Sequence, residues 1–100
     1  MTEYTDNMKA ADDMHHYGFA IVAIAGGFVL VGDVIRSGGE ILISRSATLR
    51  SWGTTKGLGE LYEGPTKKTE LDPEGEVIAP YGQVLKIIPV SDSWDKHLTK

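Results

Sequence analysis

The chain has 100 residues, of which 41% are hydrophobic, enough for one domain and no more. It contains no cysteine, which excludes disulfides and thiolate zinc sites. Its net charge of −4 argues against sequence-independent binding to duplex nucleic acid, because such binding needs many basic residues to neutralise phosphates.

The composition divides the chain into a polar N-terminal arm (1–16), a single β-rich domain (17–90) and a C-terminal tail (91–100). In the arm, Asp12, Asp13, His15 and His16 have metal-ligating side chains, but adjacent ligands in one run lack a preorganised geometry, so we predict no metal site. The first eleven residues show no signal-peptide pattern, and the longest apolar stretch is too short to span a bilayer. We expect a cytoplasmic location and no membrane partner.

The first half of the domain predicts three strands. Residues 19–24 and 28–35 are rich in β-branched and aromatic side chains, and Gly26-Gly27 between them predicts a two-residue hairpin turn. Gly32 predicts a bulge or a sharp bend, and Asp33 is interpreted as an outward charge that protects a sheet edge. A turn at 36–39 leads to a third strand, 40–49, with one apolar face.

The second half predicts a polar loop at 66–75, a short strand at 76–79, a turn at 80–82 and a last strand at 83–90. Pro89 lacks an N–H, so it should lie at a sheet edge. Trp94 in the tail should dock on the domain or on another subunit. The predicted fold is mainly β: a small five-stranded antiparallel barrel or β-roll with one short helix between strands 3 and 4. Because the early strands are apolar on both faces, we also predict a homo-oligomer.

That helix is predicted at about 56–63, from good N-cap residues (Thr54 and Thr55) and the stop signal Gly64-Pro65. Gly57 and Gly59 in its first turn cost roughly 1 kcal/mol each relative to Ala, so close approach of a ligand is one explanation for them. A first turn without side chains exposes backbone N–H groups that favour a phosphate or carboxylate.

Basic side chains and a Trp surround this segment. The candidate ligand-binding residues are Arg50, Trp52, Thr54, Thr55, Lys56, Gly57, Gly59, Lys67 and Lys68. In this interpretation the cations attract an anion and Trp52 stacks on a base or sugar. The alternative stays open: the glycines allow tight packing, the Trp anchors a core or interface, and the lysines are solvated surface. The segment is neither a dinucleotide fingerprint nor a Walker loop.

Residues 50–73 contain Trp-Gly-Thr-Thr-Lys-Gly-Leu-Gly-Glu-Leu, then Gly-Pro-Thr-Lys-Lys-Thr and Leu-Asp-Pro. In these motifs the chain resembles a family of small uncharacterised proteins of bacteriophages and prophages, over about 17–90. The resemblance implies a phage context, and with it a host bacterial cell as the location, and a compact β-rich fold. It implies no particular activity.

Two functional hypotheses follow. The first is a non-enzymatic, phage-encoded binding protein, an anti-defence factor that sequesters a small nucleotide-like immune signal in an oligomer. The alternative is a structural or interaction protein of the phage, either a minor virion component or an adaptor that binds a host protein. We predict no enzymatic activity and no cofactor, because the three histidines lie in the arm and tail and Glu60 lacks positioned catalytic partners.

Overall fold

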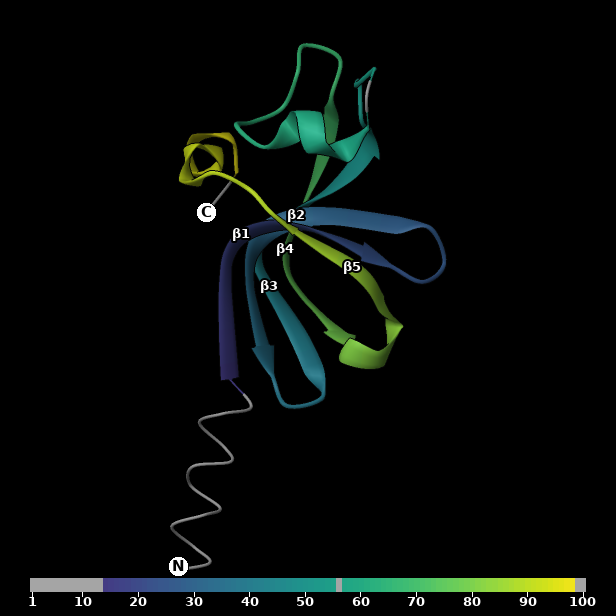
Figure 1. Ribbon diagram of the computed structural model, residues 1–100, viewed down its shortest axis with the longest axis vertical. Helices are drawn as coiled ribbons and strands as arrows, with labels where there is room; N and C mark the ends of the chain where they lie inside the picture. The colour runs from purple at the N-terminus through teal and green to yellow at the C-terminus, as the bar shows by residue number, and fades with distance from the viewer. Residues whose placement is uncertain (1–13, 56, 99–100) are drawn as a thin grey trace, which may run out of the picture.

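The computed structural model describes residues 14–55 and 57–98. Most of the predicted arm and the candidate ligand residue Lys56 lie outside these ranges, whereas residues 14–16, assigned to the arm, begin the first strand. The elements are β1 (Met14–Ile24), β2 (Phe28–Ser37), β3 (Glu40–Ser51), η1 (Leu58–Leu61), β4 (Glu70–Pro80), η2 (Tyr81–Gln83), β5 (Val84–Pro89) and η3 (Asp92–His97), where η marks a 3-10 helix (Figure 1).

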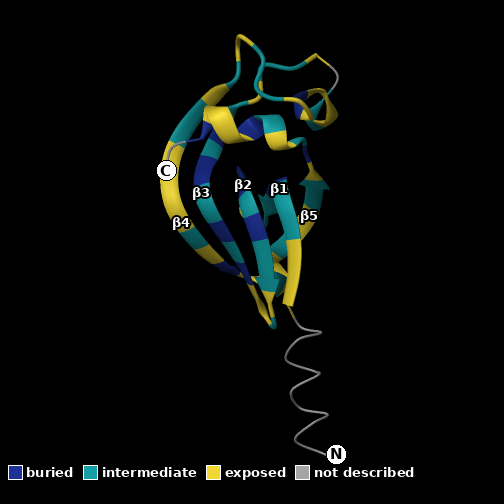
Figure 2. Ribbon diagram, turned by 90° about the vertical axis from the view of Figure 1, so that its left-hand side faces the viewer, coloured by how far each residue is buried: buried dark blue, intermediate teal, exposed yellow. Residues whose placement is uncertain are grey.

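The five strands form one antiparallel sheet in the order β4-β3-β2-β1-β5, which confirms the prediction of a mainly β fold. The sheet wraps around its own axis without pairing β4 to β5, so it is an open roll and not a closed barrel (Figure 2). Pro89 lies at the end of the edge strand β5, as predicted. In residues 14–55 and 57–98, the helices lack the length and the hydropathy of a membrane-spanning helix.

A bend crosses the middle of the sheet. Arg45 is an extra residue in β3, where the register against β2 shifts, and its φ of 53° is the one positive value among the described non-glycine residues. Gly32 faces this bulge: a Cβ there would lie 2.7 Å from Ile43 Cγ2 and 2.8 Å from the carbonyl oxygen of Ser44. The missing side chain therefore makes room for the bulge, and the bend predicted at Gly32 is confirmed. In Figure 1 the β1–β2 hairpin turns sideways while the β2–β3 hairpin runs downward.

The inner face of the roll carries one hydrophobic cluster, formed by Ala20, Val22, Leu30, Val34, Ile41 and Ile43. Side chains from both edges of the sheet, including Val77 of β4 and Val84 and Ile87 of β5, pack against it. Residues at the two edges can reach the same cluster only because the sheet rolls over it.

The outer face carries a second cluster, which η1 and η3 cover. Trp94 is fully buried in it, together with Ile21, Val31, Ala47, Leu49, Leu61, Val90 and Leu98. The tail therefore docks on its own domain. The homo-oligomer was predicted on the ground that one chain cannot cover both apolar faces of the sheet. That ground is wrong, because a single chain buries the clusters on both faces. The homo-oligomer itself stays a prediction.

Three local predictions need correction. The first hairpin has a three-residue turn, because Ile24 pairs with Phe28. β4 begins at Glu70 and not at Glu76, because the acidic stretch before Glu76 pairs with β3 and Pro73 is tolerated in an edge strand. Asp33 lies in β2, which has a neighbour on each side, so it protects no sheet edge.

We expect Gly32→Ala to lower the free energy of unfolding by about 1–3 kcal/mol, since its Cβ would press on the bulge backbone. Gly39→Ala is the matched control, because a Cβ there meets nothing within 4 Å, and it should cost no more than about 0.5 kcal/mol. Urea unfolding followed by circular dichroism measures both. Equal stability of the two variants would show that the bend does not depend on Gly32.

Candidate functional site

The candidate site is the connection between β3 and β4, residues 52–69, here called the lobe. It rises above one end of the sheet and contains η1 (Figure 1). It is longer than most connections in compact domains, whose median length is about 4–6 residues, and connections on the surface often carry binding sites. Its geometry therefore bears directly on the predicted ligand site.

Hydrogen bonds hold the two arms of the lobe together at its stem. The Thr69 hydroxyl donates to the carbonyl of Trp52 at 2.6 Å, and the Thr66 hydroxyl donates to the carbonyl of Gly53 at 2.7 Å. Gly53 has a φ of 66°, and a Cβ on it would lie 2.3 Å from the carbonyl carbon of Lys68. The stem therefore requires glycine at this position, both for its backbone conformation and for the close approach of the other arm.

A short helix lies between β3 and β4, as predicted, but it is shorter than the predicted 56–63: η1 is a single 3-10 turn of four residues whose N-cap is Gly57. Glycines at 57 and 59 disfavour a longer helix. Thr55 does not cap it, because both its N–H and its hydroxyl donate to the Glu60 carboxylate, at 3.2 and 2.9 Å. A carboxylate of the same chain thus occupies donors that the sequence interpretation assigned to an anionic ligand.

The tail supports the lobe through hydrogen bonds to η1 and to the residues directly after it. The Trp94 indole N–H donates to the carbonyl of Leu61 at 2.7 Å, and both residues are fully buried. The backbone N–H of Ser91 donates to the carbonyl of Tyr62, and the Ser93 hydroxyl donates to the carbonyl of Glu63. η1 is therefore anchored to η3, so the lobe has fixed contacts at both ends.

Arg50 lies at the base of the lobe and is paired with carboxylates of β4. Its Nε is 2.9 Å from Asp72 Oδ2, and its terminal nitrogen is 2.8 Å from Glu70 Oε1. The hydrogen bond with Asp72, followed by the negative charges of Asp72 and Glu70, raises the pKa of Arg50 above its ordinary value. Arg50 stays charged at any working pH, but two neighbouring carboxylates balance that charge.

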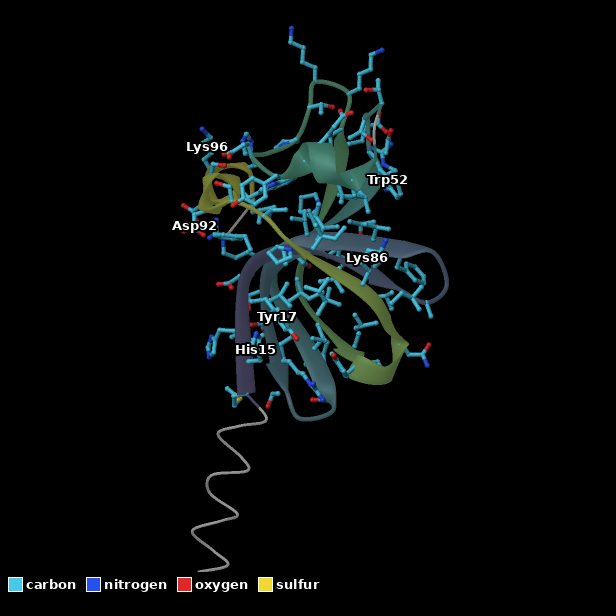
Figure 3. The ribbon with its side chains drawn as sticks, in the orientation of Figure 1. His15, Tyr17, Trp52, Lys86, Asp92 and Lys96 are labelled. Carbon is cyan, nitrogen blue, oxygen red and sulfur yellow. The ribbon has the colours of Figure 1, made fainter. Side chains whose placement is uncertain are left out.

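The other predicted site residues are placed as follows. Lys67 and Lys68 are exposed in the turn before β4, Thr54 is half-buried, and Gly57 and Gly59 flank the start of η1. Trp52 is 41% exposed and projects from the side of the lobe opposite to Asp92 and Lys96 of η3 (Figure 3). The structure therefore places these residues in one lobe, above the paired Arg50 at its base.

The catalytic possibility rests on one pair. The Thr55 hydroxyl and the Glu60 carboxylate are in hydrogen-bond contact, yet acid–base catalysis also needs an oriented base and oxyanion donors around the reacting atom. Among the described residues, no group of three or more His, Asp or Glu side chains could hold a metal ion. The absence of enzymatic activity stays a prediction.

Comparisons of the chain with protein-family models, curated proteins and solved structures found no match. The resemblance to phage proteins therefore stays a prediction.

The sequence interpretation missed a hollow of about 390 Å³ on the inner face of the sheet. It is lined by Ile24, Phe28, Leu30, Thr48, Glu74 and Val77. These residues come from four strands, so no local motif marks them. Their one signal is strand alternation, which places Phe28 and Leu30 on one face of β2.

We expect Gly53→Ala to loosen the stem, because the added Cβ would collide with the backbone of Lys68 and Thr69. Amide hydrogen exchange should show at least tenfold faster exchange at Thr66 and Thr69, whose N–H groups bond within the stem. The control is Gly59→Ala, where a Cβ meets nothing within 4 Å and exchange should be unchanged. Equal exchange in both variants would contradict the account of the stem.

Proposed function

We propose that the protein is a non-enzymatic binding protein of a bacteriophage, which recognises a host protein through the lobe. The observation that carries the proposal is Trp52, a large apolar side chain that is 41% exposed on a cross-linked stem. In the described structure the Trp52 side chain is not part of a buried cluster and makes no hydrogen bond. Neither packing nor hydrogen bonding within the chain therefore accounts for a Trp at this position.

The fixed stem favours a role in recognition. Trp is enriched among the few residues that dominate protein–protein affinity, and it costs little conformational entropy when its backbone is already held. Thr69 holds the Trp52 carbonyl, and the tail holds η1, so the Trp is presented on a preorganised surface. Tyr62, which is 52% exposed, adds a second aromatic group to the lobe.

Charge also favours a protein over a small anion. Arg50 is paired with Glu70 and Asp72, and the donors of Thr55 are taken by Glu60. An anion at the start of η1 would have to displace carboxylates that are covalently part of the chain. A protein surface can pack on the exposed aromatic rings without breaking those contacts.

The test compares Trp52→Ala with Leu85→Ala, an exposed aliphatic side chain of β5 outside the lobe. Host proteins retained by the wild type are identified by mass spectrometry, purified and titrated against each variant by calorimetry. We expect Trp52→Ala to weaken binding about 30-fold or more, which corresponds to a hot spot of about 2 kcal/mol, and Leu85→Ala to bind as the wild type does. Circular dichroism checks that both variants are folded. If Trp52→Ala binds the host protein as tightly as the wild type does, the lobe is excluded as the binding surface.

The second candidate is sequestration of a small nucleotide-like immune signal, which would make the protein an anti-defence factor. Lys67 and Lys68 support it, because both are exposed in the same lobe as Trp52. They can attract the phosphate of a nucleotide whose base stacks on the Trp52 indole. An oligomer could bring the lysines of one lobe to the Trp of another. The phage resemblance motivates this role by analogy only.

For this candidate the probes are cyclic dinucleotides and ADP-ribose derivatives, titrated by calorimetry. We expect the double variant Lys67→Ala/Lys68→Ala to lose tenfold or more in affinity, and Lys96→Ala, an exposed lysine of η3, to lose none. Native mass spectrometry of the purified protein reports the subunit number and any retained ligand. The absence of heat with all probes and of any retained ligand would reject sequestration while leaving the protein-binding proposal intact.

A further inference from the structure

The hollow on the inner face lies between the β1–β2 hairpin and the β3–β4 pair. One wall comes from the β1–β2 hairpin, through Ile24, Phe28 and Leu30, and the other from β3 and β4, through Thr48, Glu74 and Val77. Its volume of about 390 Å³ falls in the range of small-molecule sites. It is distinct from the lobe, whose candidate ligand residues do not line it.

The walls of the hollow are mainly apolar. Ile24, Leu30 and Val77 belong to the inner hydrophobic cluster or pack against it, so their positions are fixed by the core of the domain. Phe28 differs from them, because the residue is 59% exposed. An apolar body that entered the hollow would therefore cover aromatic surface that the chain itself leaves in water.

Glu74 is the charged residue of the lining, and its position is set by Thr48. The Thr48 hydroxyl donates to Glu74 Oε2 at 2.9 Å across the β3–β4 pair. A carboxylate offers about four acceptor sites on its two oxygens, so this one bond leaves capacity for a donor from a ligand. The hollow thus combines apolar walls with one oriented acceptor, as small-molecule sites commonly do.

The charges around the hollow select the sign of a ligand. β4 carries Glu70, Asp72 and Glu76 besides Glu74, and the cation paired with them is Arg50, which contacts Glu70 and Asp72. Four carboxylates against one guanidinium give this edge of the sheet a negative potential. A cation is therefore attracted, and an anion of the same shape is repelled.

We propose that the hollow binds a small organic cation with an apolar body, in the form of a primary arylalkyl amine. The ammonium group donates to Glu74, and the apolar body packs between the β1–β2 hairpin and Val77. Phe28 covers the bound molecule and places its ring near the charge, where a cation–π contact adds to the attraction. This site goes beyond the function proposed for the lobe and does not rest on it.

The test is an NMR titration of the wild-type protein with tryptamine, and with indole-3-acetate as an anion of similar shape. We expect tryptamine to shift the amide signals of Phe28, Thr48 and Glu74 in a saturable way, and indole-3-acetate to leave them unchanged. Added salt should weaken tryptamine binding, because the site is open to solvent. Absence of saturable tryptamine shifts, or equal binding of both probes, would overturn the proposal.

Two variants separate the carboxylate from general charge effects. Glu74→Gln keeps the shape of the side chain and removes its charge, so tryptamine affinity should fall about tenfold or more. Glu40→Gln is the matched control, since Glu40 pairs with Pro80 at the end of β3 away from Thr48 and the hollow. The affinity of this variant for tryptamine should stay within twofold of that of the wild type. If both variants lose tryptamine affinity equally, the net charge of the protein attracts the amine and Glu74 forms no specific site, which would overturn the proposal.

Discussion

The bend at Arg45 and Gly32 is the constraint on which the rest of the structure depends. The extra residue in β3 folds one half of the sheet over the other, and this buries the inner cluster between strands that are not neighbours in the sheet. The bulge also aims the Arg45 guanidinium at the tail, where it bonds the Asp95 carboxylate and the carbonyl of Leu98. Those contacts hold η3 on the outer face, and η3 in turn carries Trp94, which supports the lobe through the carbonyl of Leu61. One backbone irregularity thus connects the core to the candidate site.

This arrangement solves the problem of a sheet that is apolar on both faces in a chain of 100 residues. Rolling buries the inner face, and two short 3-10 helices from different parts of the chain cover the outer one. What stays exposed are single apolar side chains, such as Ile78 on β4 and Leu85 on β5. Both edge strands also carry features that discourage pairing with other chains: proline and several carboxylates in β4, and a bulge and Pro89 in β5. Within residues 14–55 and 57–98 both hydrophobic clusters are buried, so an association of these residues would depend on their surface side chains.

The sequence predicted the features that depend on local pattern. Residues 28–35 and 40–49 were identified as strands because alternation and β-branched side chains are local signals, and Gly32 was correctly linked to a bend.

The features that the sequence did not predict involve contacts between residues distant in the chain. The start of β4 depends on pairing with β3, which brings Arg50 to Asp72 and Thr48 to Glu74. The short helix predicted from caps and spacing is present, but only as the 3-10 turn Leu58–Leu61, and the predicted cap residue Thr55 donates to Glu60 instead of capping it. The lobe could be identified as a candidate site from its composition, whereas the hollow could not, since its lining is assembled only by folding.

Arg50 divides the two candidate surfaces. It lies between the lobe, with its exposed Lys67 and Lys68, and the acidic strand β4, and it neutralises the carboxylates nearest to the lobe. Without that pairing, Glu70 and Asp72 would place two uncompensated negative charges beside any partner of Trp52. With it, Glu74 and Glu76 are the carboxylates of β4 that Arg50 does not pair. In the two proposals, this one guanidinium separates a lobe surface that meets a protein or an anion from a hollow that takes a cation.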